Sequence, residues 1–479
     1  MAPSTEYPLA RDELALRWND VDIGYPELTA LADAAWSVVD GLPGSGPVGV
    51  LGRKSPVTIA VVLACLRSGR PFLLPPPDLG ADVRAELLRV AGCGHVLRVE
   101  ADGTAVEPVD GAVDRSDLAG VGFMLTTSGS TGVPKVVPLP RDAVAAFTDW
   151  AAAHFGIGPG TAVFNYAPLN FDLCLLDVWT TLAHGGRSVL VDPDRALDAK
   201  YLLRTFEGAG VEVVQGVPML YRLLLDAAGG RAFPEVREVV CTGEAMPSAL
   251  LAELPRLFPN ARLHNVYGCT ETNDSFIHEI DPAQGVPVPI GRPIGGTTAL
   301  LLADDGTVVT GAGTGELLVS TPFQAGRYLD PALTARAWTP GPPGAPDGWY
   351  FRSGDRVRRD QDGVLRLVGR TDFQVKVRGV RTNLQEIERV MLDHPGVTDA
   401  VVLAVPDDTT GNRLHAIVRR TPGQALNSLG LRRHCAANLP RTAIPSDLDI
   451  TDDEFPRTST GKVDRKMLTK GVRLRAATH

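Results

Sequence analysis

The sequence has no apolar stretch long enough to cross a membrane. Its longest apolar run, TIAVVLACL from Thr58, has nine residues, and the N-terminal stretch MAPSTEYPLARDELALRW carries acids and no apolar segment. A membrane-spanning helix needs about twenty apolar residues, and a secretion signal needs an apolar core. We therefore expect a cytosolic protein without a membrane partner.

Closely spaced cysteine pairs and blocks of basic residues are also missing. The net charge is −9, and the basic residues are scattered along the chain, which argues against a nucleic-acid partner. No C-x-x-C pair occurs, so we expect reduced, mostly buried thiols instead of a disulfide framework or a metal site. The six cysteines are Cys65, Cys93, Cys174, Cys241, Cys269 and Cys435.

The composition is that of a globular protein with a large core. Of its 479 residues, 44% are hydrophobic and 22% are charged, so no signature of disorder is present. The length favours more than one domain. From Tyr25 to about Val191, helical patterns alternate with short apolar runs, and the alternation continues as far as RLHNVYG. This pattern predicts a layered α/β domain with a largely parallel sheet.

The texture of the sequence changes toward the C-terminus. From residue 297, short strand patterns and turns predict a β-rich part over about 297–371. After GRTDFQVKVRG the chain reads as a compact α+β tail, in which LQEIERVM has one apolar helical face formed by Leu384, Ile387, Val390 and Met391. We predict a large N-terminal domain, residues 1–371, and a small α+β domain, residues 372–479.

One loop has the composition of a phosphate-binding site. TSGSTGVPK follows the apolar run VGFML, and its glycines let backbone N–H groups approach a ligand while its hydroxyls and lysine suit phosphate oxygens. The spacing differs from the G-x-x-x-x-G-K-[ST] loop of Walker-type NTPases. An ordinary Gly/Ser surface turn is the alternative interpretation. The candidate residues are Thr127, Ser128, Gly129, Ser130, Thr131, Gly132 and Lys135.

Two further polar segments follow strand patterns in the same way. TGEAM comes after EVVC, and YGCTETN comes after RLHNV. Ligand-binding loops of α/β folds gather beyond the carboxyl ends of the strands, so we expect these segments to contribute to one site.

Taken together, TSGSTGVPK, YGCTETN, YFRSGD, GRTDFQVKVRG and TGKVDR resemble, in order and spacing, the adenylate-forming superfamily, and most closely the amino-acid adenylation domains of nonribosomal peptide synthesis. The resemblance extends from about Tyr25 to Arg465. It implies that a carboxylate is coupled to the α-phosphate of ATP with release of pyrophosphate, and that the acyl group then passes from AMP to a thiol.

The resemblance assigns nucleotide-binding roles to single positions. Lys462 matches the lysine that bridges the two reacting anions, Glu271 the residue that holds Mg²⁺, and Thr270 a phosphate contact. Tyr267 matches the aromatic residue that stacks on adenine, and Asp355 the carboxylate that accepts both ribose hydroxyls. The remaining positions are Asn265, Gly243, Glu244 and Ala245 around the base, Arg370 on the ribose, and Asp372 as the hinge between two poses of the tail.

Substrate choice rests on Asp172, an acid among apolar neighbours in NFDLCLLDVW. A buried carboxylate needs a partner, and a substrate ammonium would supply one; an N-cap of the following helix is the alternative. The resemblance places an α-amino group at this position. It also predicts a pocket that suits a small or polar amino acid, in which Asp274 either binds a second polar group or faces water. The pocket residues are Leu173, Leu176, Gly216, Val240, Thr242, Val266, Asp274 and Ser275.

The pattern predicts a freestanding ligase that uses ATP and Mg²⁺ and loads a separate carrier protein through its phosphopantetheine thiol. The D-alanine-activating ligases of lipoteichoic acid show a similar pattern. One alternative is an acid:CoA ligase, against which Asp172 argues. Another is a nucleotide-binding module without activity, which the joint presence of Lys462, Glu271 and Asp355 disfavours.

Overall fold

The computed structural model describes residues 13–472 except 78, 101–102, 128–133, 245, 247, 285–287, 371–373, 408–410, 457–464, 466 and 470–471. At some helix and strand positions, Arg370 among them, it describes the backbone alone. The chain divides into two compact units. The large unit comprises most of the chain up to residue 371, and the small unit comprises the chain from residue 372 with residues 79–84.

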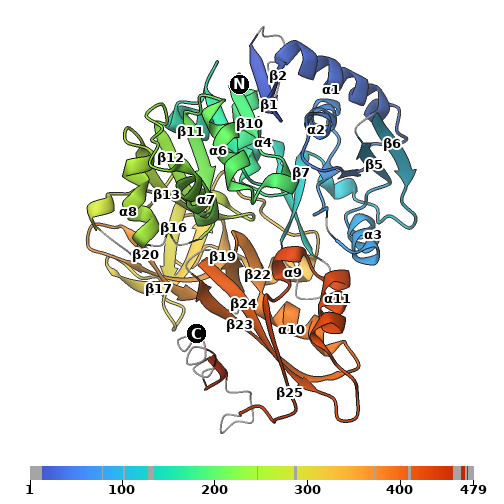
Figure 1. Ribbon diagram of the computed structural model, residues 1–479, viewed down its shortest axis with the longest axis vertical. Coiled ribbons are helices and arrows are strands. Elements are labelled where there is room, and N and C mark those ends of the chain that lie inside the picture. The colour runs from blue at the N-terminus through green and yellow to red at the C-terminus, as the bar shows by residue number, and fades with distance from the viewer. Residues whose placement is uncertain are drawn as a thin grey trace. The chain divides into compact units, whose positions relative to one another are not determined.

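A large mixed sheet organises the centre of the large unit (Figure 1). Its inner strands β13, β12, β11, β9, β10 and β1 are parallel, as the alternating pattern predicts, and the strands at both edges are antiparallel. The order is β15 (Arg292–Pro293), β14 (Asn273–Glu279), β13 (Arg262–Cys269), β12 (Glu238–Thr242), β11 (Val213–Gly216), β9 (Ala162–Asn165), β10 (Arg187–Leu190), β1 (Leu14–Trp18) and β2 (Val21–Gly24).

A second sheet of the large unit is also parallel in its interior and antiparallel at its edges. Its order is β6 (Gly103–Pro108), β5 (His95–Glu100), β3 (Val48–Leu51), β4 (Phe72–Leu73), β7 (Val121–Thr127) and β8 (Lys135–Pro140). The candidate phosphate loop thus joins two neighbouring antiparallel strands, whose ends pair Thr127 with Lys135.

Helices separate most of these strands, and local capping fixes where several begin. Ser55 caps α2, because its hydroxyl accepts from the Thr58 amide at 3.2 Å, and the helix ends at Gly69 with a φ of 76°. Asp198 and Asp330 cap α6 and α9 in the same way. The α-helices of this unit are α1 (Tyr25–Asp40), α2 (Pro56–Ser68), α4 (Arg141–Phe155), α5 (Thr181–Ala183), α6 (Ala199–Glu207), α7 (Pro218–Ala228), α8 (Ser248–Leu257) and α9 (Pro331–Ala337), and α3 (Ala81–Val90) crosses the unit boundary. Short 3₁₀ turns span Ser116–Leu118, Pro193–Arg195, Pro282–Gln284 and Arg441–Ala443.

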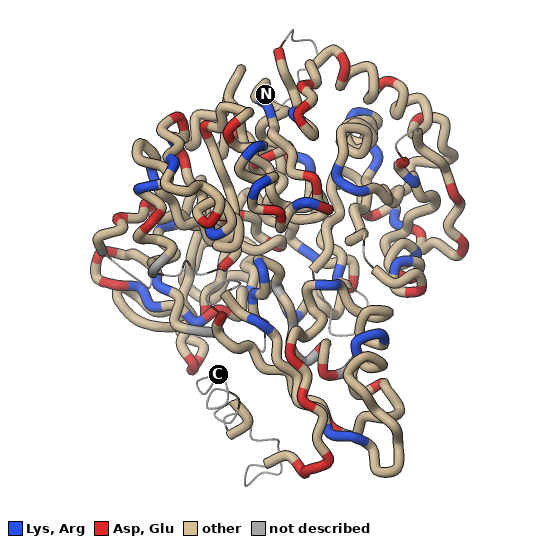
Figure 2. The backbone as a smooth tube through the Cα atoms, in the orientation of Figure 1, with Lys and Arg blue, Asp and Glu red and all other residues tan. Residues whose placement is uncertain are grey.

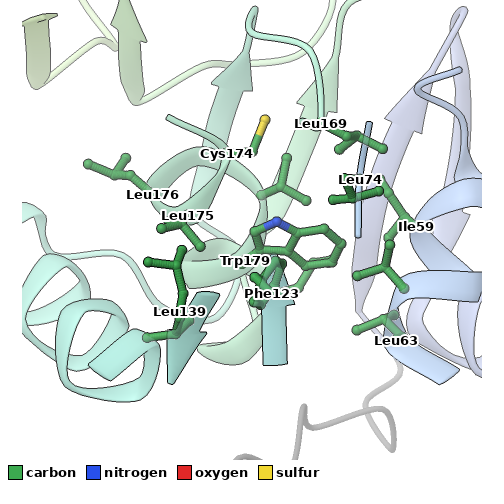
Figure 3. Close-up of a cluster of buried hydrophobic side chains, with 14 of the residues drawn as sticks. Ile59, Leu63, Leu74, Phe123, Leu139, Leu169, Cys174, Leu175, Leu176 and Trp179 are labelled. Carbon is green, nitrogen blue, oxygen red and sulfur yellow. The ribbon is translucent and has the colours of Figure 1, made fainter. Parts of the chain in front are cut away.

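Two hydrophobic clusters cover opposite faces of the large sheet. Val213 and Val240 belong to the cluster shared with α1, α2 and α4, whereas Val214 and Val239 belong to the cluster shared with α6, α7 and α8. Successive side chains of a strand point to opposite faces, so a sheet covered on both sides needs the continuous apolar runs seen in the sequence. The first cluster includes Trp179, which Figure 3 shows between Ile59 of α2 and Leu175.

The expected β-rich part of the large unit is an antiparallel sheet. Its order is β16 (Thr298–Leu302), β17 (Gly313–Ser320), β19 (Trp349–Arg359) and β18 (Trp338–Pro340), and β20 (Leu365–Arg370) also pairs with β19. The segment TPGPPGAPDG, residues 339–348, has the proline and glycine content of a loop. Its first two residues, Thr339 and Pro340, nevertheless belong to β18 and pair with β19.

The small unit is α+β, as predicted. Leu384, Ile387, Val390 and Met391 are all buried in its core, which confirms the predicted apolar face of α10. Its elements are β21 (Gln374–Val377), β22 (Val380–Asn383), α10 (Leu384–Leu392), β23 (Val397–Asp407), β24 (Gly411–Arg420), α11 (Ser428–Asn438) and β25 (Asp447–Thr451).

The cysteines, the charged residues and the helices bear on the expectations from composition. Five of the six cysteines are buried and Cys269 is partly buried, as expected. Figure 2 shows acidic and basic residues interspersed along the chain. Among the described helices, none combines the length and the apolar character needed to span a bilayer.

Candidate functional site

Several of the predicted site residues lie at the carboxyl ends of parallel strands in the large sheet. β12 and β13 are neighbours, with Thr242 paired to Val266, so the TGE turn and the YGCTET segment leave the sheet side by side. β11 and β9 follow on the other side of β12, and Gln215 pairs with Asn165 at their ends. This is the edge at which α/β sheets bind ligands.

Asp172 and Thr270 come from sequence segments 98 residues apart, and the structure joins them. The Thr270 hydroxyl donates to Oδ2 of Asp172 at 2.7 Å, and both side chains are partly buried. Asp172 was predicted to bind the substrate, and Thr270 was predicted to contact the phosphate. Their hydrogen bond makes the two predicted regions continuous.

The apolar residues of the predicted pocket share one environment. Leu176, Val240 and Val266 are buried in the cluster that contains Trp179, and Leu173 packs against it. Thr242 is buried on the same strand as Val240, two residues farther on, and hence on the same face. We refer to these residues as the apolar wall, in which Leu173 directly follows Asp172 in the chain.

The two polar residues predicted on β14 differ in their surroundings. Ser275 is fully buried, and its hydroxyl donates to the carbonyl oxygens of Thr272 at 3.0 Å and Asn273 at 3.2 Å. It therefore stabilises the turn before β14. Asp274 is partly exposed, and its backbone N–H donates to Oδ1 of Asn273 at 2.8 Å.

At the end of β11 the structure corrects the position named from the sequence. A Cβ on Gly216 would lie 2.5 Å from Cδ2 of Leu220, so this residue faces α7 and the opposite hydrophobic cluster. The preceding residue, Gln215, is 1% exposed and donates from Nε2 to the Leu173 carbonyl at 2.9 Å. The side chain on the face of Val240 is therefore that of Gln215, which sequence reasoning missed because a one-residue shift along a strand exchanges the faces.

Glu271 is the buried acid of the site. Its side chain is 2% exposed, and the hydroxyl of Tyr328 donates to its Oε1. The Lys135 ammonium lies 5.1 Å from the centre of the Tyr328 ring, within cation–π distance. Tyr328 thus links the end of the candidate phosphate loop to Glu271. Tyr328 was not predicted from the sequence. The only indication of its role was that it is an aromatic residue in a segment without a helix or strand pattern.

Glu271 also fits the metal that the resemblance implies. Mg²⁺ is typically held by one or two carboxylates together with substrate phosphates. Among the described residues, no group of three His, Cys, Asp or Glu side chains could hold a metal by itself. A buried carboxylate with one oxygen oriented by Tyr328 therefore suits an ion whose other ligands come from ATP.

A hydrogen bond between Tyr267 and Asp355 connects the large sheet to the β-rich part. The Tyr267 hydroxyl donates to Oδ2 of Asp355, which is 6% exposed and lies on β19. Asp355 also receives support from Ser353, whose hydroxyl accepts from the Asp355 amide at 3.0 Å and donates to the Leu317 carbonyl at 2.8 Å. The backbone of Asp355 pairs with that of Arg370.

The remaining nucleotide-binding candidates are partly described. Asn265 donates from Nδ2 to the Pro289 carbonyl at 2.7 Å, and Gly243 turns the chain with a φ of 85° before the partly buried Glu244. The other predicted positions lie outside the described residues: Ser128, Gly129, Ser130, Thr131, Gly132, Ala245, Asp372, Lys462 and the side chain of Arg370.

Comparison with known proteins identifies the class. The sequence matches the AMP-binding enzymes over residues 100–329 and the C-terminal domain of AMP-binding enzymes over residues 386–462. It is 30% identical to the D-alanine–D-alanyl carrier protein ligase of Bacillus velezensis over 96% of both chains. The chain belongs to this family of adenylate-forming enzymes, as its motifs predict.

Other relatives are larger or more distant. Phosphinothricin tripeptide synthetase PhsB of Streptomyces viridochromogenes is 35% identical over 95% of this chain, and the match spans 40% of that protein's length. Among solved structures, the Vibrio cholerae adenylation domain AlmE in complex with glycyl-adenosine-5'-phosphate has a TM-score of 0.84 at 20% identity, over 99% of this chain and 98% of that chain. This similarity establishes the fold: a large N-terminal α/β domain followed by a small C-terminal domain.

Proposed function

We propose that this protein activates a small or polar amino acid as its aminoacyl-adenylate, using ATP and Mg²⁺, and passes the aminoacyl group to the phosphopantetheine thiol of a separate carrier protein. The observation that carries the proposal is the hydrogen bond from Thr270 to Asp172. It connects Asp172, which directly precedes Leu173 of the apolar wall, with the segment that leads to Glu271.

On the amino-acid side, Asp172 binds the substrate ammonium. Its carboxylate is partly buried, and its Oδ2 is oriented by Thr270. An ammonium beside it compensates a charge that burial would otherwise disfavour. The wall formed by Leu173, Leu176 and Val240 then contacts the aliphatic part of the substrate.

The far end of the pocket favours a substrate side chain that donates a hydrogen bond. Oε1 of Gln215 is buried without a hydrogen-bond partner among the described residues, and Nε2 is fixed on the Leu173 carbonyl. A buried acceptor without a partner costs about 1–3 kcal/mol, which a donor on the substrate would recover. A hydroxyl or an amine meets this requirement, and Asp274 would be its second partner.

On the nucleotide side, each oriented acid has one task. Asp355 accepts the ribose hydroxyls, and Tyr267 stacks on adenine. Mg²⁺ bound by Glu271 would neutralise charge on the phosphates as pyrophosphate departs. Lys462 bridges the substrate carboxylate and the α-phosphate, and Asp372 is the hinge that brings the small domain into its adenylation and thiol-transfer poses.

The thiol acceptor is proposed from a relative of similar length. The chain covers 96% of a protein named as a carrier protein ligase. An acid:CoA ligase would share the first half-reaction. The thiol acceptor can therefore be identified only by measuring the second half-reaction, in which the acyl group is transferred.

The first experiment measures pyrophosphate release over a panel of proteinogenic and nonproteinogenic amino acids, with aryl and fatty acids as controls. We expect a response to one small or polar amino acid, followed by thioester formation on a phosphopantetheinylated carrier protein and not on coenzyme A. A response only to acids without an amine would contradict the role of Asp172. Thioester formation on coenzyme A alone would assign the enzyme to the acid:CoA ligases.

Changing Tyr267 to phenylalanine should weaken ATP binding selectively. The variant keeps the ring that stacks on adenine and removes the hydroxyl that orients Asp355. Loss of one hydrogen bond of about 1 kcal/mol predicts a several-fold higher KM for ATP, with the KM for the amino acid unchanged. Steady-state kinetics with each substrate varied in turn measure both.

Tyr350 supplies a matched control on β19. Its hydroxyl donates to the Pro346 carbonyl at 3.0 Å, so Tyr350→Phe removes a hydrogen bond that no site residue makes. This variant should keep the KM for ATP. An equal rise for both variants, or an unchanged value for Tyr267→Phe, would refute the ribose role of Asp355.

A further inference from the structure

Lys54 is a buried lysine outside every motif of the predicted site. It follows β3 of the second sheet, directly before the capping residue Ser55 of α2, and only 4% of its surface is exposed. Lysine is almost never buried unless its charge is compensated, because transfer of an ammonium out of water costs several kcal/mol. Its surroundings must therefore compensate the charge.

The ammonium is held by the segment that leaves the end of β9 in the large sheet. Nζ donates to Oδ1 of Asn165 at 2.8 Å, and it lies 3.0 Å from the Ala167 carbonyl, 3.2 Å from that of Tyr166 and 3.3 Å from that of Asn165. Lys54 thus gathers the carbonyl oxygens of three consecutive residues. One side chain ties the second sheet to the edge at which the large sheet carries its site.

Asp177 supplies the opposite charge through Asn165. The Asn165 amide donates from Nδ2 to Oδ1 of Asp177 at 2.9 Å, and Asp177 is completely buried. Burial lowers the pKa of Lys54 to about 8 and raises the pKa of Asp177 to about 7, because both charged forms are removed from water. The pair is uncharged in sum whether or not a proton passes between its members, and the ammonium form of Lys54 supplies the larger number of donors to the oxygen atoms around it.

The segment held by Lys54 is the one that carries Asp172. Between Asn165 and Leu175 the chain forms no regular helix or strand, and its position depends on such links. The Cys174 thiol donates to the Pro168 carbonyl at 3.1 Å, and Gln215 donates to the Leu173 carbonyl at 2.9 Å. At the far end, the π-helical turn Leu175–Thr180 is anchored by Trp179, whose ring lies 5.4 Å from that of Phe123.

We propose that Lys54 is a positioning residue for amino-acid binding: by fixing residues 165–167 it sets the place of the Asp172 carboxylate beside Thr270. This inference rests on the proposed function of Asp172. The hydrogen bonds of Lys54 go to Asn165, Tyr166 and Ala167, none of which is a predicted pocket residue, so it acts through the backbone that joins Asn165 to Asp172. A displacement of Asp172 by a fraction of an ångström weakens the ammonium contact, whereas the pair of Tyr267 and Asp355 on the nucleotide side makes its hydrogen bond apart from this segment.

The test replaces both charges at once. Lys54→Met alone would leave Asp177 buried without its partner and could prevent folding. In the double variant Lys54→Met, Asp177→Asn, both new side chains are uncharged and similar in volume to those they replace. The hydrogen bonds from Lys54 to the carbonyl oxygens of residues 165–167 are then lost. Lys200→Met, an exposed lysine on α6, is the matched control.

The expected result is a split between the two substrates. In the double variant, the KM for the amino acid should rise by about tenfold or more, with the KM for ATP and the melting temperature close to wild type. Hydrogen–deuterium exchange of the free protein should be faster over residues 165–177. Unchanged amino-acid KM, or a parallel loss in both substrates with a lower melting temperature, would overturn the positioning role.

The exchange measurement also separates the two proposals. If the wild-type protein activates no amino acid, the proposed function fails. Exchange over 165–177 then still decides whether Lys54 holds this segment: faster exchange supports that part, and unchanged exchange refutes it.

Discussion

Replacing Lys462 with alanine is expected to lower amino-acid-dependent pyrophosphate release by about 10²- to 10³-fold, because attack of a carboxylate on a phosphate brings two anions together and a positioned cation offsets their repulsion. The other cation of TGKVDR is already engaged: Arg465 donates to Oε2 of Glu388 and, at 3.3 Å, to the Val402 carbonyl. It is therefore not available to replace Lys462. Pyrophosphate exchange under saturating ATP measures the effect.

Lys466 provides the control, since it lies in the same tail four residues later. Lys466→Ala should keep most of the activity, and both variants should keep the wild-type melting temperature. Full activity in Lys462→Ala would show that the motif does not act as the resemblance implies. If the wild-type protein were also inactive with every acid, a nucleotide-binding module would be the better description.

Replacing Asp172 with alanine should reduce kcat/KM for the amino acid by about 10²-fold or more. Removal of one member of a buried charge pair costs about 2–5 kcal/mol, because the substrate ammonium is left without its partner. The Thr270 hydroxyl loses its acceptor as well. The KM for ATP should change little, and pyrophosphate exchange over a range of amino-acid concentrations measures the loss.

A substrate without the amine isolates the contact. The corresponding desamino acid should be a poor substrate for the wild-type enzyme, and Asp172→Ala should hardly affect its activation. The comparison is a thermodynamic cycle. The loss of kcat/KM caused by Asp172→Ala with the amino acid, beyond the loss with the desamino acid, measures the coupling between the carboxylate and the ammonium. Equal losses with both substrates would show that Asp172 acts on the fold, for instance as a helix cap, and not on the amine.

The alternation of helices and strands could be predicted because it depends on local patterning. The apolar face of α10 is buried as its 3.6-residue period requires, and the apolar residues Val213 and Val214 became part of an inner parallel strand, β11, covered on both faces. The antiparallel edges of both sheets could not be read in this way. Pairing at an edge depends on which segment returns to it, and hydrophobic period does not encode that choice.

The site was predicted in part, through its motifs. Asp172, Thr270, Glu271, Tyr267 and Asp355 were named from the sequence. The structure joins Thr270 to Asp172 and Tyr267 to Asp355 by hydrogen bonds, and Glu271 is hydrogen-bonded to Tyr328. Gly216 was predicted as a pocket residue, whereas the side chain on the face of Val240 is that of Gln215. Because side chains alternate between the two faces of a strand, an error of one residue selects the wrong face. Tyr328 and Lys54 were missed, since each reaches its partners across a long sequence separation.

The sequence by itself determined the family, the order of elements and the chemical character of the site, because these depend on residue types at fixed local spacings. Only the tertiary structure decided which side chains orient the acids. Thr270 on Asp172, Tyr267 on Asp355 and Tyr328 on Glu271 each join residues at least 57 positions apart. The first contact arises because parallel strands place their carboxyl ends at one edge. The other two bring β19 and the irregular segment of Tyr328 against residues of β13 and of the turn that follows it, and all three exist only once the fold has formed.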